Sequence, residues 1–200
     1  MRNLTRHLLI VFGAVFIGCG SVPPTYYYRL DYDINTNPSS VDASVPVTLG
    51  IGSLDADLLY ESEKIVYRDT KYEAKFYNYR KWIAPPKKMI GEKIVKDYQR
   101  SGRFNRVIAL PSSQPADYIL GGRVLSFEEW DEGQSWYGSV AIEFSLKKAD
   151  SYDTIWEKTL SDRTAAANKE PAEVVIAINK SLNKVIQQSI EDTSNFLATQ

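Results

Sequence analysis

Side chains that commonly carry out catalysis are scarce in this chain of 200 residues. It contains one histidine, His7, and one cysteine, Cys19, and both lie close to the N-terminus. Histidine and cysteine supply many of the general bases, thiol nucleophiles and zinc or copper ligands of proteins. The chemistry open to this protein therefore depends on what happens to its first residues.

The residues around Cys19 resemble a processing signal. A short basic head containing Arg2 and Arg6 precedes an apolar run over residues 8–17, and small residues close on the cysteine in the stretch GAVFIGCGS. This layout is typical of a lipoprotein signal peptide. We expect residues 1–18 to be removed, Cys19 to carry lipid, and residues 19–25 to form a lipidated tether. The membrane partner is then the bilayer that holds the lipid.

Two other interpretations of the N-terminal segment are a plain secretory signal and an uncleaved membrane anchor. A membrane-spanning helix needs roughly 20 apolar residues, and a run of roughly 10 to 14 is more typical of the apolar part of a signal. The run that ends at Gly18 is in the shorter class, and Gly20, Ser21, Pro23 and Pro24 interrupt any extension. The lipoprotein signal is the interpretation we adopt.

Processing at Cys19 has chemical consequences for the mature chain. Cleavage removes His7, and lipidation converts the Cys19 thiol into a thioether. This excludes histidine acid–base chemistry, thiol nucleophiles, disulfides and most zinc or copper sites. We expect no enzyme activity, no metal and no cofactor. Without Arg2 and Arg6 the 24 basic side chains fall to 22 against 25 acidic ones, which does not suggest a nucleic-acid partner.

Two aromatic groups are candidate contact sites for a partner. The first lies in a Tyr-rich segment, and the second lies beside a run of carboxylates that contains Glu128, Glu129, Asp131 and Glu132. Aromatic and Arg side chains are common at interface hot spots, whereas the alternative is that the rings fill a sheet core. The candidate partner-binding residues are Tyr79, Arg80, Trp82, Trp130, Trp136 and Tyr137.

The carboxylate run has two further interpretations. A solvated acidic turn is the simpler one. A calcium loop needs oxygen ligands at an ordered spacing with a conformational glycine and a distal glutamate, and this run lacks that spacing. We therefore predict no metal site here.

Apolar periodicity predicts the elements that position these residues. We expect one domain over residues 26–200 with an α+β fold, in which two main helices pack on one face of a mixed or mostly antiparallel sheet. The stripe of the last helix is expected to be core, with a partner-helix seam as the alternative. The expected elements are strand 26–32, strand 45–54, a hairpin within 61–82, helix 87–101, strand 104–110, a hairpin of 116–130 and 139–148 around a turn at 131–138, strand 154–161 and helix 171–197.

Several segments in this order resemble the ABC-type transport auxiliary lipoproteins, a family that includes the paraquat-inducible lipoproteins of the PqiC type. They are CGSVPPTYYYRL at 19–30, VTLGIGSL at 47–54, EKIVYRD at 63–69, YRKWIAPP at 79–86 and ADYILGGRVLSFE at 116–128. The similarity covers nearly the whole mature chain.

The resemblance implies a lipid-anchored outer-membrane protein that faces the periplasm. Such a protein is a non-catalytic component of a system that moves lipids or other hydrophobic molecules. Its implied partners are a substrate-binding protein of the mammalian-cell-entry type and, in many systems, an ABC permease and ATPase. Gly20 stands where an inner-membrane retention signal has Asp, which agrees with outer-membrane sorting. A homo-oligomer is a further option, and scaffolding of an envelope enzyme such as a cell-wall synthase is the alternative function.

Overall fold

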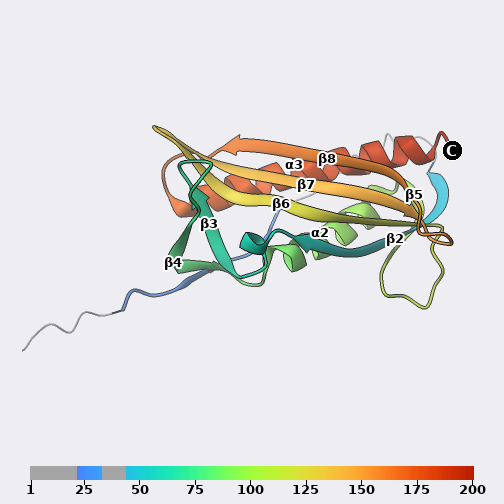
Figure 1. Ribbon diagram of the computed structural model, residues 1–200, viewed down its shortest axis with the longest axis horizontal. Helices are drawn as coiled ribbons and strands as arrows, with labels where there is room; N and C mark the ends of the chain where they lie inside the picture. Colours follow the sequence, from blue (N-terminus) through green and yellow to red (C-terminus); the bar gives the residue numbers. More distant parts are fainter. Residues whose placement is uncertain (1–21, 33–43) are drawn as a thin grey trace, which may run out of the picture.

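The computed structural model describes residues 22–32 and 44–200 (Figure 1). The predicted signal peptide, Cys19 and the start of the tether lie outside the described residues. The described elements are β1 (Tyr26–Tyr28), β2 (Val45–Ala56), the 3₁₀ helix η3 (Leu58–Tyr60), β3 (Lys64–Arg68), β4 (Lys75–Trp82), α2 (Pro86–Ser101), β5 (Phe104–Ala109), β6 (Tyr118–Glu132), β7 (Ser135–Lys148), β8 (Thr154–Ala165) and α3 (Pro171–Leu197).

The eight described strands form one mixed sheet that is organised around β6. One edge of β6 pairs antiparallel with β7, which pairs antiparallel with β8. The other edge of β6 is shared, because β2 pairs with its first part and β3 pairs with its last part, both in parallel. The strand β5 extends the sheet beyond β2, and β4 followed by β1 extends it beyond β3. The sheet therefore has two separate groups of strands beside this edge of β6, one formed by β2 and β5 and the other by β3, β4 and β1.

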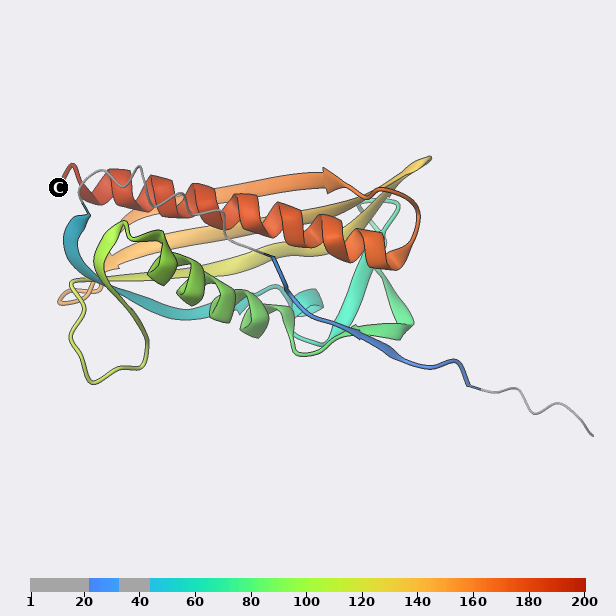
Figure 2. The same cartoon turned by 180° about the vertical axis from the view of Figure 1, so that it is seen from behind.

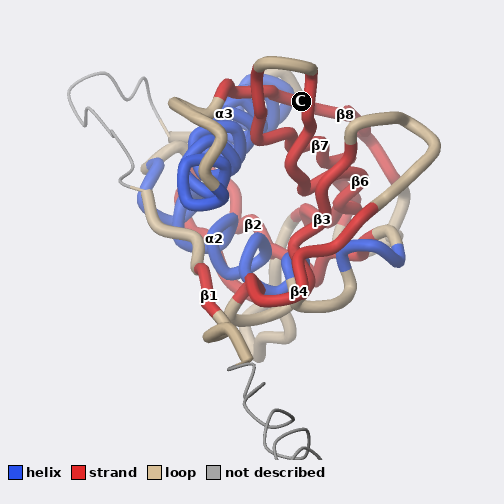
Figure 3. Tube along the Cα trace, turned by 90° about the vertical axis from the view of Figure 1, so that its left-hand side faces the viewer, coloured by secondary structure: helices blue, strands red, loops and turns tan. Residues whose placement is uncertain are grey.

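Both helices cover the same face of this sheet (Figures 2 and 3). Helix α3 lies along β7 and β8, and α2 lies against β2 and β5. Helix α2 starts with Pro86 at its first turn and ends at Gly102, whose φ of 66° is the left-handed conformation that glycine adopts readily. The predicted α+β fold with two helices on one face of a mixed sheet is confirmed.

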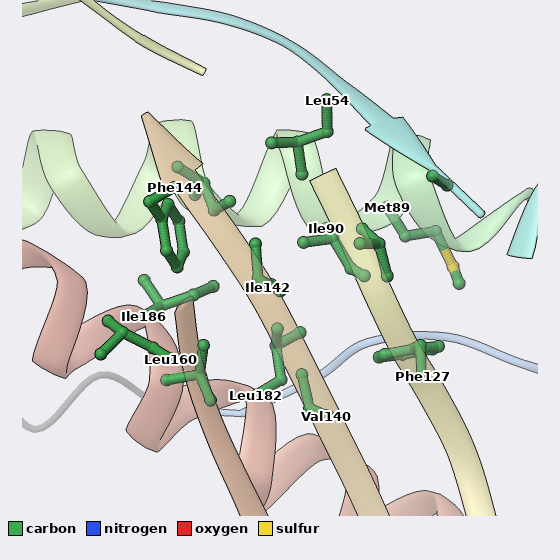
Figure 4. Packing of buried hydrophobic residues seen from close by; sticks show 14 of the residues in the cluster. Leu54, Met89, Ile90, Phe127, Val140, Ile142, Phe144, Leu160, Leu182 and Ile186 are labelled. Carbon is green, nitrogen blue, oxygen red and sulfur yellow. The ribbon is translucent and has the colours of Figure 1, made fainter. Parts of the chain in front are cut away.

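The core lies between α3, α2 and the sheet (Figure 4). Ile142 and Phe144 of β7 face Leu182 and Ile186 of α3, and all four side chains are fully buried. Burial of one such side chain contributes roughly 1.5–3 kcal/mol relative to exposure. The apolar stripe of α3 is therefore core, as the helical period predicts, and is not a free seam for a partner helix.

No described helix has the length and apolar composition that a membrane span requires.

A glycine lets α3 lie directly on β7. A Cβ atom added to Gly138 would lie 2.5 Å from the carbonyl carbon of Ala177 and 2.7 Å from Cα of Ile178. Both neighbours are backbone atoms of the helix, which cannot rotate away as a side chain can. The absence of a side chain at this position therefore allows the close helix–sheet contact.

Three predicted elements differ from the structure by more than two residues at one end, and one of them, the strand predicted at 154–161, runs on to Ala165. The turn predicted at 131–138 is wrong, because β6 runs to Glu132 and β7 starts at Ser135, leaving Gly133 and Gln134 as the connection. The polar residues that suggested a loop are cross-strand partners in a continuous ladder, and Gly133 at φ +54° makes the turn tight. The strand predicted at 26–32 pairs only over Tyr26–Tyr28, although the half-buried Leu30 and Tyr32 beyond it still pack against the core.

Candidate functional site

A cluster of aromatic and charged side chains lies at the tip of the β6–β7 hairpin. Trp130 of β6 and Tyr137 of β7 are cross-strand partners. The Arg163 guanidinium of β8 lies 5.4 Å from the ring centroid of Trp130 and 4.2 Å from that of Tyr137. Its Nη1 is 2.9 Å from Oε1 of Glu132. We call Trp130, Glu132, Tyr137 and Arg163 the tip cluster.

The tip cluster is separate from the hydrophobic core. Trp130 and Tyr137 are half-buried and are not among the side chains that pack against the core, whereas Trp136 is. Trp136 is paired with Asp131, one residue along β6 from Trp130, so its side chain lies on the opposite side of the sheet. The structure therefore brings Trp130 and Tyr137 together and places Trp136 apart from them.

The arrangement of the tip cluster suits protein recognition. Trp, Tyr and Arg are the side chains most enriched at interface hot spots. Arg163 is held by two rings and one carboxylate, which orders a side chain that otherwise loses much conformational entropy on binding. A preordered cluster of this kind offers a partner a rigid contact surface.

Two adjacent carboxylates are buried next to the tip cluster on β6. Glu128 is 5% exposed, and its Oε2 accepts hydrogen bonds from the Tyr60 hydroxyl at 2.6 Å and from Arg68 Nε at 2.7 Å. Arg68 neutralises this carboxylate, and desolvation together with Glu128 raises the pKa of Tyr60. The hydrogen bonds of Glu128 with Tyr60 and Arg68 connect β6 to η3 and β3.

Glu129 lies in a different environment from Glu128. It is 1% exposed, and the Tyr77 hydroxyl donates to both of its oxygens at 2.9 and 3.0 Å. Burial, with a further contribution from the neighbouring Asp131, raises the pKa of Glu129 to about 8. Burial also raises the pKa of Asp131. Within residues 22–32 and 44–200 no group of three or more acidic, His or Cys side chains is arranged to hold a metal.

Glu129→Gln is expected to remove part of the pH dependence of stability. The folded chain keeps a proton on Glu129 up to a pH of about 8, whereas the unfolded chain releases it near the ordinary value of 4.5. The free energy of unfolding of the wild type therefore falls as the pH rises through this window. We expect the variant to be more stable than the wild type by about 1–3 kcal/mol at pH 8 and nearly equal to it at pH 4.5.

Urea unfolding at a series of pH values measures this difference. Glu132→Gln changes an exposed carboxylate in the same hairpin and serves as the control, with the pH slope of the wild type expected. Equal pH slopes for Glu129→Gln and the wild type would show that Glu129 ionises normally in the folded chain.

The first predicted contact group, Tyr79, Arg80 and Trp82, is divided by the structure. Trp82 is 0% exposed, and its ring lies 5.0 Å from that of Phe127. The prediction that Trp82 contacts a partner is therefore wrong, because a strand places alternate side chains on opposite faces and Trp82 lies on the core side. Trp82 is a core residue, and its contact with Phe127 packs β4 against β6.

Arg80 and Tyr79 lie on different sides of β4. The Arg80 guanidinium lies 5.7 Å from the ring centroid of Tyr26 and 5.8 Å from that of Tyr77, and its Nε is buried. The Tyr79 side chain is 40% exposed. The β3–β4 pairing shifts register between Lys64 and Val66, so a simple alternation along β4 does not predict the side on which each residue lies.

The sequence interpretation missed Arg163 and the burial of Glu129. Arg163 lies in a strand whose sequence alternates polar residues, and nothing local distinguishes it from an ordinary surface cation. Glu128 and Glu129 did carry a signal, since they follow the apolar segment VLSF of a strand that would otherwise be buried. Carboxylates in that position predict buried hydrogen-bond partners.

Comparison with known proteins gives one family and one fold. A family model described as ABC-type transport auxiliary lipoprotein component matches residues 28–189. No curated protein matches the chain. Protein XCC0632 from Xanthomonas campestris superposes with a TM-score of 0.75 at 21% identity, covering 87% of this chain and 97% of the other. Protein CT253 from Chlamydia trachomatis gives a TM-score of 0.50 at 7% identity, covering 78% and 99%. These two likenesses show the fold alone.

Proposed function

The chain belongs to the ABC-type transport auxiliary lipoprotein component family, and from this premise we propose that it is a non-catalytic adaptor of a transport system at the outer membrane. Acylated Cys19 holds the domain on the periplasmic side. The domain contacts a substrate-binding protein of the mammalian-cell-entry type, and through it an ABC permease and ATPase supply the energy. The cargo is a lipid or another hydrophobic molecule.

The observation that carries the proposal is the tip cluster. Trp130 and Tyr137 are large aromatic side chains that the hydrophobic core does not use, and the Arg163 guanidinium lies over both rings. Recognition by such a cluster needs no histidine and no free thiol, which agrees with a mature chain whose only cysteine is the lipidated Cys19. Tethering adds to the association, because confinement of both proteins at one membrane raises their effective concentration.

Trp130→Ala is expected to weaken partner binding about 30-fold or more, because truncation of a central hot-spot side chain costs about 2 kcal/mol or more. The fold should persist, since Trp130 does not pack against the core. The measurement is binding of the full-length lipoprotein, in detergent or vesicles, to the purified mammalian-cell-entry-type protein. Tyr72→Ala is the matched control, because Tyr72 is 91% exposed in the β3–β4 loop outside the tip cluster. Equal affinity of the two variants would refute the role of the tip cluster.

A crosslinking experiment identifies the partner class directly. A photoreactive residue at Gln134, in the exposed turn beside the tip cluster, should capture the mammalian-cell-entry-type protein in cells. The same probe at exposed Ala198, near the end of the chain, should not capture it. Capture of a cell-wall synthase at Gln134 would instead favour the alternative role as the scaffold of an envelope enzyme.

A further inference from the structure

A basic and aromatic surface covers the outer side of β1 and β4. Tyr27 pairs with Lys81 across the β1–β4 ladder, and Lys64 pairs with Lys81 across the β3–β4 ladder, so these three side chains share one side of the sheet. Tyr79 and Ile83, two residues before and after Lys81, are exposed, and the backbone N–H of Ile83 donates to the carbonyl oxygen of Tyr28, the residue next to Tyr27. The Lys64 ammonium lies 5.0 Å from the ring centroid of Phe76, which adds this ring to the surface. We call Tyr27, Lys64, Phe76, Tyr79, Lys81 and Ile83 the edge face.

The apolar side chains of the edge face are unusually exposed. Tyr27 and Ile83 are each 61% exposed, Tyr79 is 40% exposed and Phe76 is 38% exposed. Their strand neighbours on the other side, Tyr28 and Trp82, pack against the core. The edge face is thus the side of β1, β3 and β4 that carries these exposed side chains, opposite the side on which Tyr28 and Trp82 pack against the core. Clustered exposed apolar side chains mark interaction surfaces.

The charges of the edge face point to an anionic partner. Lys64 and Lys81 are direct cross-strand neighbours, and like charges in that position destabilise a sheet. Among the described residues neither lysine forms an ion pair with a carboxylate. An anionic surface against the edge face would offset the repulsion between them.

The tether limits the distance between the edge face and the lipidated Cys19. Residues 22–25 are described and exposed, and they lead directly into β1. Tyr27 is eight residues from Cys19, and an extended chain spans at most about 3.6 Å per residue, so the two are separated by no more than about 29 Å. Figure 2 shows β1 beside β4 at the end of the molecule opposite the C-terminus. The edge face therefore stays close to the lipidated residue.

We propose that the edge face lies on the anionic headgroup surface of the membrane that holds Cys19. Tyrosine and lysine are the side chains that favour this zone, because their apolar parts enter the interface and their polar ends reach water and phosphate. The contact orients the domain, with the end that carries the C-terminus directed away from the bilayer. The inference rests on the anchor in the proposed function but not on the identity of the transport partner.

The test uses the full-length lipoprotein in vesicles of phosphatidylethanolamine and phosphatidylglycerol. Because lipidation consumes the only native thiol, a fluorophore can be placed on a single new cysteine by Ile83→Cys, with Ala198→Cys as the control at the opposite end. A nitroxide attached to the lipid headgroups quenches fluorophores that lie at the membrane surface. We expect strong quenching at position 83, little at position 198, and loss of most of the quenching at 83 when Lys64→Gln and Lys81→Gln are added.

The outcomes separate this inference from the proposed function. Flotation of both labelled proteins with the vesicles first verifies the anchor, and failure of both to float would overturn the anchor itself. Flotation with equal quenching at positions 83 and 198 would overturn the edge face as a membrane contact while leaving the adaptor role intact. If the fluorophore emission at position 83 changed with the density of the protein on the vesicles but was not quenched by the nitroxide, the edge face would contact a second copy of the chain. That result would also overturn the proposal.

Discussion

Cys19→Ser is expected to transfer the protein from the membrane fraction to the soluble fraction. Serine has no thiol, so the thioether that carries the diacylglycerol cannot form. Each buried methylene contributes about 0.8 kcal/mol to membrane attachment, and a single acyl chain binds only marginally, whereas several chains make a stable anchor. Fractionation of cells, together with the mass of the N-terminal peptide, measures both attachment and lipidation.

The comparison is made with Val22→Ala, a change in the same tether that keeps the cysteine. This variant should remain in the membrane fraction. A small residual association of Cys19→Ser is expected from the edge face, since each lysine near an anionic surface contributes about 1 kcal/mol, and salt should remove it. Normal, salt-resistant attachment of Cys19→Ser would contradict the lipid anchor.

Gly138→Ala is expected to lower the stability of the domain strongly. The new Cβ would meet backbone atoms of Ala177 and Ile178, and relief requires α3 to move away from β7 along a buried contact. Overpacking of this kind costs about 3 kcal/mol. In a domain of this size the corresponding decrease in melting temperature is about 9 °C. Thermal unfolding followed by circular dichroism measures it.

Gly121→Ala is the matched control for the glycine at the helix–sheet contact. Gly121 lies in the adjacent strand β6, and its added Cβ would have Ser145 Oγ at 3.7 Å as its nearest neighbour, an ordinary contact distance. We expect this variant to unfold within about 0.5 kcal/mol of the wild type. If Gly138→Ala lowered the stability of the domain as little as Gly121→Ala does, α3 would have to lie farther from β7 than the structure places it.

Periodicity along the chain was enough to locate most elements. The stripe Val174, Ile178, Leu182 and Ile186 predicts a helix over 171–197, and α3 has these bounds. The signal is strong because a helix repeats its buried face many times within one segment. Alternation also places Tyr28, Leu30 and Tyr32 on the inner side, although the hydrogen-bonded strand ends at Tyr28.

The aromatic residues show where local pattern is insufficient. Trp82 and Trp130 both lie in Tyr- or Glu-rich strands, yet one is fully buried and the other belongs to the tip cluster. The difference is set by two register shifts, one between Lys64 and Val66 in the β3–β4 pairing and one between Val124 and Ser126 in the β6–β7 pairing. A shift of one residue moves a side chain to the opposite face of the sheet.

The sequence by itself limits the histidine to His7 and the cysteine to Cys19, because the number and positions of these residues are a matter of composition. It also determined the helices, because their apolar period is local. Only the tertiary structure decided that Arg163 lies over the rings of Trp130 and Tyr137, that Tyr77 donates to the buried Glu129, and that Lys64 is the cross-strand partner of Lys81. Each of these contacts joins strands whose pairing and register are set by the packing of the whole sheet against α2 and α3, and no window of sequence contains that information.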